Sequence, residues 1–185
     1  MMRYAPVFAA VAALAFAGQA QAATTVLGNG LASICSKAAI AGSDDPKALE
    51  ICTMALETEA MNRRDRAGTF VNRGVLKMRR QDYAAARTDF NTATRLQPTM
   101  GEAFVNRGAA LVGEKRYVEA LVDIDKGLAL QPEEPEKAYY NRGLANEGLD
   151  DTKAAYFDYL KALELAPDWD IVKRELTRFT VRTAD

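Results

Sequence analysis

The sequence has no histidine, and its 185 residues include only two cysteines and one tryptophan. Without an imidazole base, the usual activation of a serine or cysteine nucleophile is not available. Two cysteines are also too few to form a zinc site when histidine is missing. The sequence therefore predicts a protein that is not an enzyme and that holds neither a metal nor another cofactor.

Other catalytic patterns are missing or have a simpler explanation. No glycine-rich phosphate loop occurs, since the glycines of the repeated region fall within predicted helices. Acidic pairs such as Asp44-Asp45 and Asp150-Asp151 lie where helices start, and carboxylates there favour the helix dipole. A hydrolase that uses such a carboxylate pair is the catalytic alternative.

The sequence also lacks an excess of positive charge. It has 24 basic and 25 acidic residues, which gives a formal net charge of −1. Domains that bind nucleic acid are normally basic because they neutralise phosphates. The composition therefore argues against a nucleic-acid partner.

The segment from Met1 to Ala22 has the layout of a secretory signal peptide. Arg3 is the only charge before an apolar run from Val7 to Ala17, and Ala20-Gln21-Ala22 follows as a small-x-small cleavage site. The run is shorter than the roughly 20 apolar residues that span a bilayer. We therefore expect cleavage after Ala22, a periplasmic location and no membrane insertion afterwards. An uncleaved N-terminal anchor is the alternative.

The tripeptide Asn-Arg-Gly occurs three times, at residues 72–74, 106–108 and 141–143, and its glycines are 34 and 35 residues apart. Repeats of this length are typical of stacked helical hairpins, which bury their apolar faces only against one another. Glycine in the middle of a helix costs about 1 kcal/mol relative to alanine. We therefore infer that two helices approach each other closely at each glycine.

Each unit has the same landmarks around the triplet. The first helix carries an aromatic residue before it, and the second helix carries two small residues around a bulky one. The second helix ends in Leu-x-Pro, where proline stops the helix. The landmarks are Phe70, Ala86, Phe90, Ala93 and Pro98, then Phe104, Ala120, Ile124, Gly127 and Pro132, then Tyr139, Ala155, Tyr159, Ala162 and Pro167.

This pattern resembles the tetratricopeptide repeat (TPR) family over three consecutive units, from about Ala67 to Pro167. The resemblance implies an all-α fold in which helical hairpins form a right-handed α-solenoid. Departures from the pattern are small. Gly127 replaces an alanine, Thr152 replaces a tyrosine, and one residue is inserted near Pro135.

We expect the three TPR hairpins to lie between two capping elements. In the final helix, Trp169, Val172, Leu176 and Phe179 recur at helical spacing and would cover the end of the stack. The predicted segments are the signal peptide (1–22), a degenerate N-terminal hairpin (23–66), three repeats (67–100, 101–135 and 136–167) and a C-terminal capping helix (168–185).

Cys35 and Cys52 fall on the core-facing stripes of the two helices predicted in the N-terminal hairpin. In an oxidising compartment, two lone cysteines in one region usually pair. We therefore expect a disulfide that links these helices, with two buried free thiols as the alternative. Closing a loop of this size stabilises a fold by about 3 kcal/mol.

A repeated spacing predicts ion pairs between packed helices. Each arginine of the triplet precedes an aspartate at the same separation in all three units, and a guanidinium can bind a carboxylate with two parallel hydrogen bonds. The aspartate of the preceding unit, at a slightly larger separation, fits the spacing equally well. The pairs within one unit are Arg73–Asp89, Arg107–Asp123 and Arg142–Asp158.

The asparagines of the triplet are the candidate binding residues. In the TPR family the first helices line a concave groove, and an asparagine here can bind the backbone of an extended peptide. The resemblance implies this role for Asn72, Asn106 and Asn141. A carboxamide both donates and accepts, so it can pair with any peptide unit. The alternative is that each asparagine bonds within its hairpin or to the next repeat.

Helical spacing places mostly small and apolar residues near these asparagines. This lining lacks the lysine and arginine cluster with which some TPR proteins hold a C-terminal carboxylate. An uncharged segment of a protein, extended or helical, is therefore the expected guest. The lining residues are Val71, Val75, Arg79, Val105, Ala109, Tyr140 and Leu144.

These features predict a non-enzymatic scaffold or adaptor of the bacterial envelope, with a protein or peptide partner bound in the concave groove. The alternative is a structural subunit of an envelope complex that assembles through its outer surface and leaves the groove unused.

Overall fold

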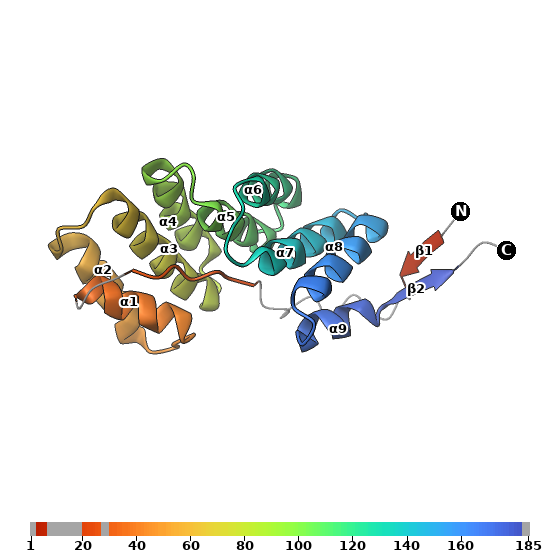
Figure 1. Cartoon of the computed structure of the whole chain (residues 1–185), viewed down its shortest axis with the longest axis horizontal. Coiled ribbons are helices and arrows are strands. Elements are labelled where there is room, and N and C mark those ends of the chain that lie inside the picture. The colour runs from red at the N-terminus through yellow and green to blue at the C-terminus, as the bar shows by residue number, and fades with distance from the viewer. Residues whose placement is uncertain (1–2, 7–19, 27–29, 183–185) are drawn as a thin grey trace.

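The structure is a computed structural model that describes residues 3–6, 20–26 and 30–182 of the chain. Nine α-helices lie in this part, and the first eight form four hairpins that stack into an elongated row (Figure 1). The predicted all-α solenoid is confirmed. The helices are α1 (Leu31–Ile40), α2 (Pro46–Thr58), α3 (Arg63–Arg79), α4 (Tyr83–Leu96), α5 (Gly101–Gly113), α6 (Tyr117–Ala129), α7 (Pro135–Gly148), α8 (Thr152–Leu165) and α9 (Asp170–Leu176).

The first helices of the repeats form one continuous layer. Helix α5 contacts both α3 and α7, while α4, α6 and α8 each pack on the first helix of their own hairpin. We call α3, α5 and α7 the inner helices. They present equivalent residues of the three repeats side by side.

The mid-helix glycines allow the two helices of a hairpin to approach closely. A methyl group at Gly108 would lie 2.5 Å from Ile124 Cγ1 and 3.0 Å from the carbonyl oxygen of Ala120. A methyl group at Gly143 would lie 2.5 Å from the ring of Tyr159. These distances are shorter than van der Waals contact, so a larger residue would push the second helix away.

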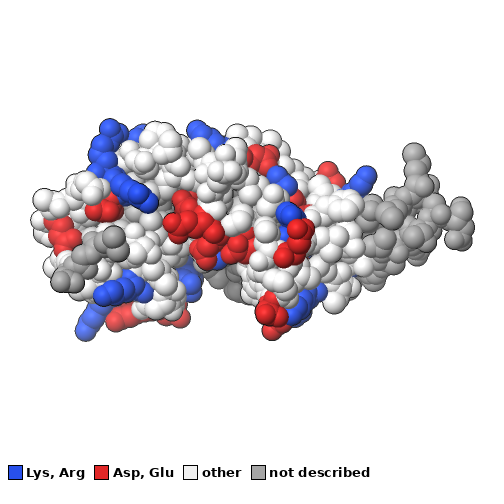
Figure 2. Space-filling view, in the orientation of Figure 1, with Lys and Arg blue, Asp and Glu red and all other residues white. Residues whose placement is uncertain are grey.

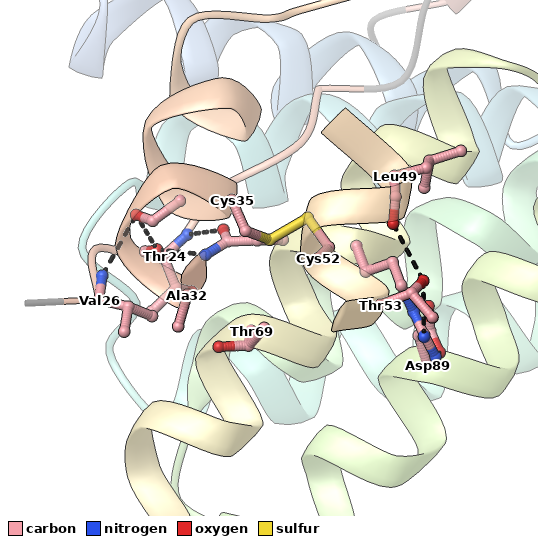
Figure 3. The surroundings of a disulfide bond; sticks show 12 residues. Thr24, Val26, Ala32, Cys35, Leu49, Cys52, Thr53, Thr69 and Asp89 are labelled. Carbon is pink, nitrogen blue, oxygen red and sulfur yellow. Dashed lines mark hydrogen bonds and ion pairs between the residues drawn. A yellow bond between two sulfur atoms is a disulfide. The ribbon is translucent and has the colours of Figure 1, made fainter. Parts of the chain in front are cut away.

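The predicted disulfide between Cys35 of α1 and Cys52 of α2 is present. Their Cα atoms are 4.9 Å apart, and both residues are fully buried in a cluster that includes Val71 of α3. Figure 3 shows Thr24 on one side of the disulfide and Asp89 on the other. The linked hairpin therefore lies between the backbone contacts of Thr24 and the ion pair that includes Asp89.

Helix starts follow local capping chemistry. Asp45 accepts a hydrogen bond from the N–H of Lys47 at 2.9 Å, and Pro46 is the first residue of α2. Asn62 likewise accepts from the N–H of Asp65 at 2.8 Å and starts α3. The first inner helix thus begins a full turn before Ala67, where the sequence pattern of the repeat begins.

The three repeat hairpins share one unusual turn conformation. In each hairpin one residue of the turn between the two helices has a positive φ angle. These residues are Gln81, Lys115 and Asp150, with φ angles of 61°, 60° and 61°. This left-handed region is unfavourable for residues that carry a Cβ atom, and none of the three is glycine. In each turn the N–H of the following residue donates to the carbonyl oxygen five residues earlier, as Asp82 does to Lys77 at 3.0 Å, so a hydrogen bond at the end of the first helix supports this conformation.

The C-terminal end differs from the prediction. Helix α9 ends at Leu176, and Phe179–Arg182 form the strand β2, which pairs antiparallel with β1 (Arg3–Pro6). The prediction that Phe179 continues a capping helix is therefore wrong. β-Branched residues such as Val181 favour a strand over a helix at this position.

Residues 20–26 run as an extended segment along the inner helices (Figure 1). They include the predicted cleavage site Ala20-Gln21-Ala22, whereas most of the predicted leader, including Val7–Ala17, lies outside the described residues. Of the helices in the described part, none has both the length and the hydrophobicity of a membrane span.

Replacing both Cys35 and Cys52 by serine is expected to lower the free energy of unfolding by about 3 kcal/mol, because the disulfide restricts the unfolded chain across a 17-residue separation. Urea unfolding followed by circular dichroism measures the change. Wild-type protein treated with reductant serves as the comparison and should behave like the double variant. An unchanged midpoint in both samples would contradict the stabilising role.

Candidate peptide-binding groove

The asparagines of the three triplets lie in a row and bind the backbone of residues 20–24. In each pair, Oδ1 accepts from the backbone N–H and Nδ2 donates to the carbonyl oxygen of the same residue. The N···O distances are 2.6 to 3.2 Å. The pairs are Asn141 with Ala20, Asn106 with Ala22, and Asn72 with Thr24.

The spacing of these pairs matches an extended chain. Neighbouring asparagines bind residues two positions apart, and alternate residues of an extended chain direct their N–H and C=O groups to the same side. Each inner helix therefore presents one carboxamide for each two-residue step of roughly 7 Å. The segment enters at α7 and runs toward α3.

The three carboxamides are fully buried, each with an exposure of 0%. Among the described residues, their side-chain hydrogen bonds go to the segment and not to a neighbouring helix. A buried polar group without a partner costs roughly 1–3 kcal/mol. An extended backbone thus supplies the hydrogen bonds that these buried groups require.

Two further side chains hold the segment. Ser36 on α1 donates its hydroxyl to the carbonyl of Thr24 at 2.9 Å and accepts from the N–H of Val26 at 3.2 Å. Lys137 at the start of α7 donates to the carbonyl of Gln21 at 3.0 Å. Neither residue was predicted from the sequence, because neither belongs to the repeated pattern.

Alternate side chains of the segment are buried in apolar clusters. Ala22 is 2% exposed and Ala20 is 9% exposed. Six of the seven predicted lining residues are buried in the core beneath the segment, and not on an open surface. Val105, Tyr140 and Leu144 share a cluster with Ala20, while Val71, Val75 and Ala109 belong to the cluster on which Ala23 packs.

Arg79 lies elsewhere. It is exposed at the end of α3, where its Nη1 donates to the carbonyl of Gly42 in the α1–α2 turn at 3.5 Å. Arg79 is two helical turns from Asn72, so the two residues lie on the same face of α3 but roughly 10 Å apart along the helix axis. The structure thus places Arg79 at the turn and not in the groove.

Each arginine of the triplet makes its paired hydrogen bonds with the aspartate of its own hairpin, and not with the equivalent aspartate of the preceding hairpin. Arg107 Nε and Nη2 donate to the two carboxylate oxygens of Asp123 at 2.6 and 2.5 Å. The aspartates are 2–7% exposed, so hydrogen bonds from the guanidinium replace contacts with water that the carboxylates have lost. The equivalent pairs are Arg73–Asp89 and Arg142–Asp158.

The remaining nitrogen of each guanidinium contacts the preceding hairpin. Nη1 donates to a polar side chain on α2, α4 or α6, at distances of 3.2, 3.0 and 2.8 Å. One arginine therefore joins three helices of two hairpins. The contacts are Arg73 with Thr53, Arg107 with Asn91, and Arg142 with Asp125.

Known proteins share this architecture. The family described as "Tetratricopeptide repeat" matches residues 136–168, which cover the third hairpin. The first TPR domain of human RPAP3 is 26% identical, with a TM-score of 0.56, over 60% of this chain and 87% of that one. MamA 41-end from Desulfovibrio magneticus RS-1 is 24% identical, with a TM-score of 0.60, over 79% of both chains. The third hairpin thus matches the tetratricopeptide repeat family, and the stack of hairpins has the fold of TPR domains.

A third TPR structure contains a bound peptide. The first TPR of Spaghetti (RPAP3) bound to the HSP90 peptide SRMEEVD is 24% identical, with a TM-score of 0.57, over 65% of this chain and 93% of that one. No curated protein sequence matches the chain.

A cavity of about 510 Å³ opens beside residues 23–25, where the connections between successive hairpins form part of its wall. Its wall includes Glu102, Glu133 and Glu134, with Arg64 as a basic residue. Figure 2 shows acidic side chains near the middle of one face of the molecule, where no continuous basic surface is visible. Within the described part of the chain, no group of His, Cys, Asp or Glu residues could hold a metal ion.

Tyr140 packs in the third TPR hairpin with an unpaired hydroxyl. It is fully buried, and among the described residues its Oη has no hydrogen-bond partner. The rings of Tyr159 and Trp169 lie 5.8 and 5.1 Å from its ring. Burial, with the charge of Glu175 nearby, raises the pKa of Tyr140, so the phenol stays neutral.

Arg107→Met is expected to lower the free energy of unfolding by about 3 kcal/mol, because it leaves the buried carboxylate of Asp123 without its cation. Arg95→Met, at an exposed position on α4, is the control and should change stability by less than about 0.5 kcal/mol. Chemical unfolding of both variants measures the difference. Adding Asp123→Leu to Arg107→Met should restore part of the loss, and equal stability of the two single variants would contradict the ion-pair role.

Proposed function

We propose that this TPR protein is a non-enzymatic scaffold of the bacterial envelope that binds an extended segment of a partner protein in its groove. The observation that supports it is the set of paired hydrogen bonds from Asn72, Asn106 and Asn141 to an extended backbone. These bonds involve only main-chain atoms of the bound residues, so segments of different sequence can satisfy them. The peptide in the Spaghetti complex supports a protein or peptide as the class of partner.

The surroundings of the groove favour a partner segment with small side chains and few charges. Ala20 and Ala22 fill the buried positions, and Lys137 is the one cationic residue of the described part that donates a hydrogen bond to the segment. Lys137 is half-buried and already pairs with Glu134 at 2.6 Å, so it is a weaker site for a terminal carboxylate than a cluster of several cations would be. Backbone hydrogen bonds and apolar burial therefore account for the proposed recognition.

Two features support export to the periplasm. The predicted signal peptide ends at Ala22, and Cys35 is paired with Cys52 in a disulfide, a bond that persists in oxidising compartments. Both features fit a protein that folds after it leaves the cytoplasm.

An outer-surface assembly is the alternative function. Val118 and Val122 on α6 are 64% and 66% exposed, and Phe157 on α8 is 47% exposed. Exposed apolar residues on the second helices can mark a contact surface for another subunit. In this alternative the asparagines have no external partner.

Export predicts a defined N-terminus. When the full-length gene is expressed in a Gram-negative host, the protein in the periplasmic fraction is expected to begin at Ala23 and to carry the oxidised cysteine pair. Intact-mass measurement with and without reductant tests both points. Retention of Arg3 in the periplasmic protein, or a cytoplasmic location, would contradict the proposal.

The groove and outer-surface functions are separated by matched variants. Asn106→Ala together with Asn141→Ala is expected to reduce partner crosslinking in the envelope at least tenfold, because two paired backbone contacts are lost. The melting temperature should change by only a few degrees, since these carboxamides do not bind neighbouring helices. Val122→Asp is the outer-surface control and should leave crosslinking intact.

The opposite result of this comparison would support assembly through the outer surface. If Val122→Asp abolishes the crosslinked product and the asparagine variant retains it, the partner binds the outer surface and the groove proposal fails. Mass spectrometry of the crosslinked peptides identifies the contact residues in either case.

A further inference from the structure

The groove is filled by the chain itself. The backbones of residues 20, 22 and 24 form six hydrogen bonds with the carboxamides of the three triplet asparagines. Ser36 and Lys137 donate hydrogen bonds to the same segment. In this arrangement no asparagine is left for a partner. A partner must therefore displace residues 20–24 or bind after some of them are removed.

The segment also shows which side chains the groove accepts. Ala20 and Ala22 are buried, whereas Gln21 and Ala23 between them are half-buried and Thr25 is exposed. Further along, a methyl group on Gly68 would lie 3.2 Å from Thr24 Cγ2, so the glycine gives the segment a close but unstrained fit against α3. The buried side takes small residues at every second position, and the other positions tolerate larger ones.

The predicted cleavage site divides this segment between its contacts. Ala20 and Ala22, which bind Asn141 and Asn106, precede the peptide bond that would be cut. Thr24, which binds Asn72, follows it. Cleavage there would free two asparagines, while Thr24 would keep its bonds to Asn72 and Ser36. The groove would then be open at α5 and α7 and closed at α3.

The cavity beside Ala23 has three acidic residues in its wall and one basic residue, Arg64. Cleavage after Ala22 creates an α-ammonium group on Ala23, which lines the cavity with Glu102, Glu133 and Glu134. Opposite charges in a partly enclosed site attract each other more strongly than in water. This attraction would hold residues 23–26 in place after the preceding residues have left.

We propose that residues 20–24 are an internal ligand that closes the groove, and that cleavage after Ala22 opens Asn106 and Asn141 for a small-x-small segment of a partner protein. The partner segment runs in the same direction as residues 20–22, from α7 to α5. It ends or leaves the groove at Ala23, which still occupies the next position. This inference rests on the proposed function and adds the sequence class of the partner and the control of access.

Competition between the internal segment and a free peptide tests the inference. The probe is a fluorescein-labelled nonapeptide with the sequence of residues 17–25, titrated into the oxidised full-length chain and followed by fluorescence anisotropy. Wild-type protein is expected to bind it weakly, because a tethered segment competes at an effective concentration near the millimolar range. Ala22→Trp should bind it at least tenfold more tightly, since tryptophan does not fit the buried position of Ala22 and expels the segment.

Two further variants complete the design. Thr25→Trp carries the same substitution at an exposed position of the segment and should bind like the wild type. Ala22→Pro removes the N–H that donates to Asn106 without adding a large side chain, so it should act like Ala22→Trp. Adding Asn106→Ala to either opened variant should abolish the gain in affinity.

The outcomes are distinguishable. If the wild type, Ala22→Trp and Ala22→Pro bind the peptide equally well, the internal segment does not close the groove and this inference fails, while the proposed function stands. If neither opened variant binds the peptide although both melt like the wild type, the groove does not bind extended segments, and the proposed function fails as well.

Discussion

The paired hydrogen bonds between arginine and aspartate determine how the rest of this structure is arranged. Each guanidinium holds a buried carboxylate on its own hairpin, and its third nitrogen holds the hairpin before it. The asparagine precedes the arginine directly in the sequence, so their side chains point about 100° apart around the helix. When the arginine is fixed between the packed helices, the asparagine is directed into the groove. The binding row thus depends on a contact that never touches the bound segment.

The disulfide-linked hairpin extends this arrangement to the N-terminal end. Ser36 follows Cys35 and binds the segment in the groove, while Thr53 follows Cys52 and accepts from Arg73. On each linked helix, the residue that follows the cysteine therefore contacts one of the two polar clusters: the groove for α1 and the first ion pair for α2. The hairpin is a degenerate repeat by sequence, yet it continues both polar patterns through serine and threonine.

The repeated pattern was sufficient to predict the hairpins, because glycine, alanine and proline at fixed spacing leave few alternatives for packed helices. It left the aspartate partner of each arginine open, since the aspartate of the same hairpin and that of the preceding hairpin both lie on helices next to the arginine. Phe179 fitted a helical stripe, but three turns of spacing do not reveal that the chain pairs as a strand instead. The left-handed residues Gln81, Lys115 and Asp150 were not predicted, because none is glycine and the backbone hydrogen bonds that support them do not depend on side chains. Nothing in the sequence indicated that residues 20–24 occupy the groove, since the contact uses their backbone and any small residues would serve.

If the chain is exported and cleaved after Ala22 as proposed, the burial of Ala20 and Ala22 affects when the cleavage can occur. A processing enzyme that recognises small side chains at these two positions needs the same groups, in the same extended form, that the groove covers. The two recognition events exclude each other, so the proposed cleavage after Ala22 requires that residues 20–22 first leave the groove. The ratio of two rates, folding and processing, then decides which form of the chain accumulates. A change that speeds folding of the third hairpin would raise the fraction of uncut chain without altering the cleavage sequence.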